Sequence, residues 1–183
     1  MIAVFGSINL DIVFSLARLP TPGATVLGEG YRLVPGGKGA NQALAAARDG
    51  AAVRMVGAVG ADGFAPLALA AMRDAGVDLS GVKVVAEPTG CAAVCVAASG
   101  ENQRAVASVA NRLVTAGQMP DALLTPATVL VLQMEVPPAE IAAAVARARA
   151  CGARTIWNFA PALAEGIERG RLAAVDVLVA NEG

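Results

Sequence analysis

The chain has 183 residues, of which 56% are hydrophobic and 16% charged, and this composition predicts a globular protein with one sizeable core rather than a disordered chain. Its formal net charge is −1, from 14 basic and 15 acidic residues without blocks of like charge, which gives no electrostatic basis for binding nucleic acid or a membrane surface. No apolar run is long enough to span a membrane and the N-terminus lacks the features of a signal peptide, so we expect a cytoplasmic protein.

Apolar runs and helix-like spacings alternate along the chain. Apolar residues spaced as on one helix face predict helices at 40–47, 64–75 and 141–148, and buried strands are predicted at 2–5, 53–59, 129–134, 155–159 and 175–179. This alternation predicts an α/β fold with three layers, α/β/α, and a mostly parallel sheet with right-handed crossovers.

Further strands are predicted without helices between them. Residues 12–16 and 25–34 are β-like and are separated by Pro20, Pro22 and Gly23, which predicts a small antiparallel addition to the sheet rather than another β-α-β unit. Short strands are also predicted at 82–85, 91–98 and 105–109, with a hairpin turn at Ser99-Gly100-Glu101-Asn102.

A glycine loop precedes the first predicted helix, with the sequence Pro35-Gly36-Gly37-Lys38-Gly39-Ala40-Asn41-Gln42. Its glycines would let the backbone approach a ligand, and we expect the unpaired N–H groups of the first helical turn to point outward as donors. Lys38 adds a cation, and Asn41 adds a donor and an acceptor. The loop is neither a Walker loop nor a dinucleotide fingerprint, because position 32 is Arg and position 42 is Gln. A turn followed by a capped core helix is the alternative.

Polar residues also stand where predicted strands end. Asn9 and Asp11 follow the first strand, and Glu135 follows residues 129–134. The carboxyl ends of parallel strands are where such sheets bind ligands. The residues alone are equally compatible with an Asx turn at Asn9 and Asp11, and with Glu135 as a cap for the helix that begins at Pro137-Pro138. Asp62 is interpreted as a cap for the helix at 64–75.

The chain contains no histidine, which excludes His-based triads and His-containing metal sites. Cys91 and Cys95 lie four residues apart in a predicted strand, too far apart for a disulfide. With Cys151 the cysteines show no metal-ligand spacing, so we expect buried, reduced thiols and no metal site.

Five motifs resemble those of the ribokinase-like (PfkB-type) carbohydrate kinases, in the order in which that family has them. The longest match is the glycine loop, and the others are Gly6 to Asp11, Leu132 to Glu135, Asn158 to Ala162, and Asn181. Phe159 stands where the family has a proline, and Ala65 where it usually has a second glycine.

The resemblance implies the three-layer fold with a small β lid, formed by strands within about 12–34 and 91–109. It implies transfer of a phosphoryl group from ATP, with Mg²⁺, to a sugar hydroxyl, and most closely to ribose. Lids of the family commonly pair between subunits, so a homodimer through the lid is expected. The implied nucleotide-side residue is Asn181, and the implied sugar-binding residues are Asn9, Asp11, Gly37, Lys38, Asn41 and Glu135.

The general base of the family is an Asp in a Gly-Ala-Gly-Asp motif, and residues 1–183 do not contain that motif. We therefore interpret the chain as the N-terminal, sugar-binding part of a kinase domain, without its nucleotide-binding part and without a catalytic residue of its own. We expect the chain alone to be inactive, and either to self-associate or to be only marginally stable in solution. A truncated, non-catalytic sugar-binding or interaction protein is the alternative.

Overall fold

The computed structural model describes residues 1–161 and 174–180. Within them the main sheet has six parallel strands in the order β10-β9-β8-β1-β4-β5. The strands are β1 (Ile2–Phe5), β4 (Val53–Gly60), β5 (Asp78–Val85), β8 (Val129–Leu132), β9 (Arg154–Asn158) and β10 (Val177–Val179). The helices are α1 (Lys38–Arg48), α2 (Phe64–Asp74) and α3 (Pro138–Ala150).

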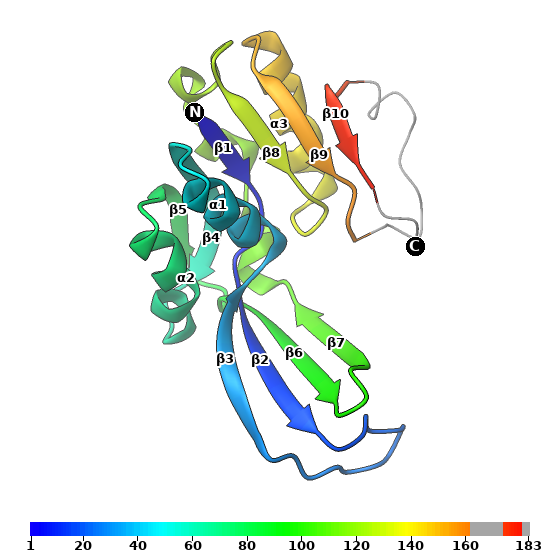
Figure 1. The fold of residues 1–183 in the computed structure, drawn as a ribbon. Helices are drawn as coiled ribbons and strands as arrows, with labels where there is room; N and C mark the ends of the chain where they lie inside the picture. The colour runs from blue at the N-terminus through cyan, green and yellow to red at the C-terminus, as the bar shows by residue number, and fades with distance from the viewer. Residues whose placement is uncertain (162–173, 181–183) are drawn as a thin grey trace.

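Helices cover both faces of the main sheet, so the predicted three layers are confirmed. Successive residues of β1 point to opposite faces: Val4 belongs to a core cluster with Ala43 of α1 and Met72 of α2. Phe5 belongs to a second cluster with Ile141 of α3. Figure 1 shows α1 in front of the sheet and α3 behind it. Within the described residues, no helix has the length and apolar character to cross a membrane.

A second sheet projects from the main sheet beyond the end of β1 (Figure 1). Its order is β3-β2-β6-β7, built from β2 (Asn9–Leu16), β3 (Gly30–Gly36), β6 (Gly90–Ala97) and β7 (Asn102–Ala107). Strands β2 and β6 run parallel and the outer pairs antiparallel, so this sheet is mixed, whereas the sequence predicts an antiparallel addition. The predicted hairpin turn is confirmed: Gly100 has φ +89° and its N–H donates to Ala97 O at 2.9 Å.

Several strand boundaries differ from the predicted ones. Strand β3 begins at Gly30 rather than at residue 25. Strand β7 spans 102–107 rather than 105–109, and it begins early because the tight turn at Gly100 lets its pairing with β6 start at once. Strand β8 ends at Leu132, two residues early. After it, the buried Gln133 donates from Nε2 to Phe5 O at 3.1 Å, and Met134 N–H donates to Ala160 O at 3.1 Å. These bonds turn the chain out of the sheet.

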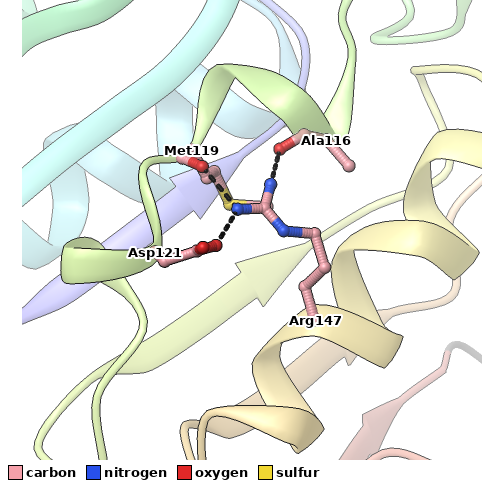
Figure 2. A network of polar contacts seen from close by, with 4 residues as sticks. All are labelled: Ala116, Met119, Asp121 and Arg147. Carbon is pink, nitrogen blue, oxygen red and sulfur yellow. Dashed lines mark hydrogen bonds and ion pairs between the residues drawn. The ribbon is translucent and has the colours of Figure 1, made fainter.

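The segment between β7 and β8 contains three 3₁₀ turns that the sequence does not predict: η1 (Val109–Leu113), η2 (Ala116–Gln118) and η3 (Asp121–Leu123). Helix α3 holds this segment through two side chains. Arg147 donates to Ala116 O, Met119 O and Asp121 Oδ1 (Figure 2). Glu140, two turns earlier on the same helix, accepts from Ala116 N–H at 2.7 Å.

The cysteines are free thiols, as expected, but none of them is fully buried. Cys91 and Cys95 both lie in β6, where residues four apart share one face. Burial raises the pKa of Cys91, and the nearby negative charge of Asp11 raises it further. The correction to the sequence-based expectation is therefore that these thiols are reduced but only partly buried.

Candidate functional site

The glycine loop lies directly against the segment that joins β1 to β2. A Cβ atom on Gly39 would lie 2.7 Å from Ser7 N, and one on Gly37 would lie 2.8 Å from Asn9 N. Gly37 also has φ +90°, a conformation that favours glycine. The close approach that these glycines allow is therefore to the protein's own backbone, whereas the sequence predicts an approach to a ligand.

The first turn of α1 is capped by residues from other elements. Glu135 Oε2 accepts from Lys38 N–H at 3.0 Å and from Ser7 Oγ at 2.6 Å. Gly39 N–H donates to Ser7 Oγ at 3.3 Å, and Ala40 N–H donates to Ser7 O at 2.9 Å. A carboxylate at a helix N-terminus is electrostatically favourable. The expectation that these N–H groups point outward is therefore wrong, and Glu135 caps α1 rather than the helix after Pro137.

Asp11 is the acid of this region that lacks a hydrogen-bond partner. Its Oδ1 atom is buried and makes no hydrogen bond among the described residues. The carboxylate lies against Gly36, where a Cβ atom would meet it at 2.5–2.6 Å. Burial raises the pKa of Asp11; the Arg104 charge opposes this and the Glu135 charge adds to it. A buried acceptor without a donor is a place where a ligand hydroxyl can bind.

The other predicted sugar-site residues lie around Asp11 in different settings. Asn9 is 4% exposed, and its Oδ1 accepts from Asn111 Nδ2 at 2.8 Å. Lys38 is half-buried at the start of α1. Asn41 is exposed one turn later, and its N–H donates to Gly37 O at 2.9 Å. The structure thus gathers segments 7–11, 36–41 and 135, with Asn9 turned toward Asn111.

Asp62 joins the second sheet to the main sheet. Its Oδ1 accepts from the N–H groups of Phe64 and Ala65, each at 3.1 Å, which confirms the predicted cap. The same carboxylate accepts from Thr89 N–H and Thr89 Oγ1, each at 2.7 Å, just before β6. Burial raises the pKa of Asp62, but these hydrogen bonds, with those from Thr89 foremost, outweigh it, so the pKa lies below its usual value.

Sequence reasoning missed the roles of Ser7 and Thr89. Each is a small hydroxyl residue next to a glycine at a strand end, Gly6-Ser7 after β1 and Thr89-Gly90 before β6. Both hydroxyls accept backbone N–H groups from other elements: Ser7 from Gly39 and Thr89 from Gly60. A hydroxyl residue beside a glycine at a strand end is the sequence signal that could have identified them.

Glu135 also lines an open pocket of about 460 Å³. The other lining residues come from β7, η1 and the residue between them, from the segment after β8 with the first residue of α3, and from the segment after β9: Val106, Ser108, Arg112, Met134, Val136, Pro137, Pro138 and Pro161. Asn181 and Ala162, which belong to two of the matched motifs, lie outside the described residues. Among residues 1–161 and 174–180, no group of three or more His, Cys, Asp or Glu side chains is arranged to hold a metal ion.

Comparisons with known proteins agree with the motifs. The model of the pfkB family carbohydrate kinases matches residues 1–183. A ribokinase of Haemophilus influenzae is 34% identical over 184 residues, covering 99% of this chain and 60% of the relative. Among solved structures, a ribokinase of Giardia lamblia has a TM-score of 0.88 at 33% identity and covers 99% of this chain and 58% of its own.

A ribokinase of Arabidopsis thaliana, complexed with ribose and ATP, has a TM-score of 0.84 at 29% identity and covers 99% of this chain and 60% of its own. The chain therefore spans about 60% of the length of these relatives. Because the family model matches along the whole chain and the fold agrees, the chain belongs to the pfkB family of carbohydrate kinases.

Proposed function

We propose that this chain carries the sugar-binding half of an ATP-dependent sugar kinase that converts ribose to ribose 5-phosphate. The observation that carries the proposal is the Asp11 carboxylate, whose buried Oδ1 has no donor among the described residues. The relatives support the choice of sugar, since those reported above are named ribokinases and one was solved with ribose and ATP.

The proposed sugar-binding residues surround Asp11, and they differ in whether they accept or donate hydrogen bonds. Asp11 accepts hydrogen bonds from sugar hydroxyls, as does Glu135 through Oε1, which the α1 cap leaves unused. Lys38 donates, Asn9 and Asn41 contribute their amides, and Gly37 contributes backbone. The proposed sugar-binding residues are thus Asn9, Asp11, Gly37, Lys38, Asn41 and Glu135.

Phosphoryl transfer depends on positioning the acceptor hydroxyl and neutralising charge on the moving group. In this proposal the chain holds and orients the sugar. ATP supplies the phosphoryl group when bound, with Mg²⁺ to neutralise its charge, and we assign Asn181 to that side of the site. Residues 1–183 contain no Gly-Ala-Gly-Asp motif, so we assign no general base to them.

Binding and turnover test the proposal separately. In calorimetry, the 183-residue chain is expected to bind ribose more tightly than fructose or deoxyribose. In an assay for ADP with ribose, ATP and Mg²⁺, it is expected to release none. Preference for fructose would refute ribose as the substrate, and sustained turnover would refute the division into halves. A stop codon directly after codon 183 would favour the non-catalytic sugar-binding protein, whereas in-frame sequence with Gly-x-Gly-Asp would favour the kinase.

We also propose that the second sheet is a lid through which two copies of the chain pair. One face of this sheet presents Ile12, Phe14, Tyr31 and Leu33 beside Phe64 of α2, around a shallow pocket of about 300 Å³. Tyr31 is 68% exposed and Leu33 41% exposed, and the rings of Phe14 and Tyr31 lie 6.1 Å apart. An exposed apolar face with a polar surround is typical of an interface.

A further inference from the structure

Asn111 is a buried polar residue, 1% exposed, whose side-chain hydrogen bonds among the described residues go to Ile8 and Asn9, where β2 begins. Its Oδ1 accepts from Ile8 N–H at 2.9 Å. Its Nδ2 donates to Ile8 O at 3.2 Å and to Asn9 Oδ1 at 2.8 Å. Asn111 comes from η1, about a hundred residues along the chain, so it joins the end of the second sheet to the candidate site.

Backbone groups determine which way both amides face. A backbone N–H can only donate and a backbone C=O can only accept, so the two groups of Ile8 leave Asn111 one orientation. Because Asn111 then donates from its NH₂ group to Asn9, the atom of Asn9 that accepts must be the side-chain oxygen. The orientation of Asn9 therefore follows from the backbone of Ile8 and is not a free choice.

This arrangement leaves the side-chain amide nitrogen of Asn9 available to donate. Among the described residues it makes no hydrogen bond, and it is not one of the buried atoms without a partner, so solvent reaches it. Asn9 and Asp11 are two apart in β2, where alternate residues share one face. A donor and an unpaired acceptor thus lie side by side on the same face.

We propose that Asn111 is a positioning residue that sets the hydrogen-bond polarity of the site. It holds Asn9 so that the position beside Asn9 offers only a donor, while the position beside Asp11 offers only acceptors. The ligand group at Asn9 must then be an acceptor, a hydroxyl or ring oxygen, and the group at Asp11 must be a hydroxyl that donates. This inference rests on the proposed sugar-binding function for the nature of the ligand, but not for the orientation of the amides.

Side-chain amide exchange measured by NMR tests the orientation without any ligand. In the wild-type chain, the Asn9 NH₂ protons should exchange rapidly with water, whereas the Asn111 NH₂ protons should be protected. Asn9→Asp removes one signal and so assigns it. In Asn111→Asp, the Asn9 amide must turn to donate to the new carboxylate, and its protons should become protected. Strong protection of the Asn9 protons in the wild-type chain would overturn the proposal.

Calorimetry with ribose tests the consequence for binding. Asn111→Asp should weaken ribose binding about tenfold, the scale of one hydrogen bond reversed. The matched control is Asn102→Asp, the same change at an exposed position of β7, and it should leave binding unchanged. If Asn111 acts through Asn9, Asn111→Asp should add no further loss in an Asn9→Ala background. An equal loss in both backgrounds would reduce Asn111 to a purely structural residue.

Fluorinated sugars give a readout that loss of stability does not imitate. Fluorine accepts hydrogen bonds weakly and cannot donate one. At one ring position, ribose with fluorine in place of the hydroxyl should therefore bind better than the corresponding deoxy sugar. Asn9→Asp should abolish that preference. Asn9→Asp keeps an acceptor for Asn111, so it tests the proposal even if Asn111→Asp fails to fold. No preference at any position would count against it. If wild-type chain bound no ribose, the proposed function would fail, while the exchange experiment would still decide the orientation.

Discussion

At the scale of single residues, the two acids of the candidate site have different duties. Glu135 uses Oε2 to hold Ser7 and the first N–H of α1, so it is part of the framework as well as of the pocket. Asp11 is held by no hydrogen bond through its buried Oδ1. Substitution at Asp11 therefore tests binding with less damage to the fold than substitution at Glu135.

Asp11→Ala and Asp11→Asn should weaken ribose binding by about 10- to 100-fold, since a hydrogen bond to a charged group contributes about 1.5–3 kcal/mol. Calorimetry measures the change, with Glu29→Gln on an exposed acid as the control. Unchanged affinity in Asp11→Ala would remove Asp11 from the site.

Asp11→Asn should also make the folded chain more stable at neutral pH. Burial raises the pKa of Asp11 above its ordinary 3.8, so between the two values the folded chain binds more protons than the unfolded chain. The stabilisation is complete below 3.8 and is lost as the pH rises through the folded pKa. Asp11→Asn should therefore unfold at higher urea than wild type at pH 7, with the difference vanishing near pH 3. A lower midpoint at pH 7 would contradict this.

At the scale of elements, Asp62 should give the opposite pH dependence. Its folded pKa lies below the ordinary 3.8, so its stabilisation is present above 3.8 and is lost as the pH falls through the folded value. Asp62→Asn should flatten this part of the acid unfolding curve. Asp62→Ala should in addition cost about 1 kcal/mol for the lost helix cap.

Urea unfolding between pH 2 and pH 7 measures both effects of Asp62. Asp74→Asn, at the other end of α2, is the matched control because it removes one negative charge from the same helix. An Asp62→Asn variant that keeps the full acid dependence of the wild-type chain would show that this carboxylate carries none of it.

The glycine loop yields a second prediction about elements. Gly39→Ala should destabilise the chain by about 1–3 kcal/mol, because the new Cβ would meet the Ser7 backbone at 2.7 Å. Gly63→Ala is the control: no atom lies within 4 Å of that position and its φ is −69°, so it should be neutral or slightly stabilising. Denaturant midpoints compare them, and equal midpoints would mean that the loop can move away from the segment between β1 and β2.

Local patterns predict the regular elements of this chain well, and long-range partners explain where they fail. The helix at Lys38–Arg48 follows from the spacing of apolar residues, and five of the six parallel strands follow from apolar runs. Strand β5 is predicted only in its second half, at 82–85, and among the further short strands rather than in the main sheet. The Glu135 cap on α1 joins residues 97 positions apart, and the Asn111 contact with Ile8 joins residues 103 positions apart. No local pattern carries that information. The η2 and η3 turns are not predicted for a related reason, because side chains of α3, about 25 to 30 residues later in the chain, bind them.

At the scale of the whole molecule, the lid pairing proposed above predicts the oligomeric state. Tyr31→Asp should weaken a dimer at least tenfold, because a charge would enter an apolar interface. Sedimentation equilibrium measures the change, and Val84→Asp, at a 67% exposed residue of β5, is the control. A dimer that survives Tyr31→Asp and dissociates in Leu178→Asp would place the interface at the β10 edge instead.

The polar contacts described above for the second sheet lie at the end of it that adjoins the main sheet. One is the Asn111 contact with Ile8 and Asn9, at the start of β2, and the other is the Asp62 contact with Thr89, just before β6. At the opposite end, a Cβ atom on Gly23 or on Gly100 would meet no atom within 4 Å. Any swing of this sheet about its attached end would therefore displace the turns near Gly23 and Gly100 further than Asp11, so the proposed sugar site would keep its shape while its cover opens.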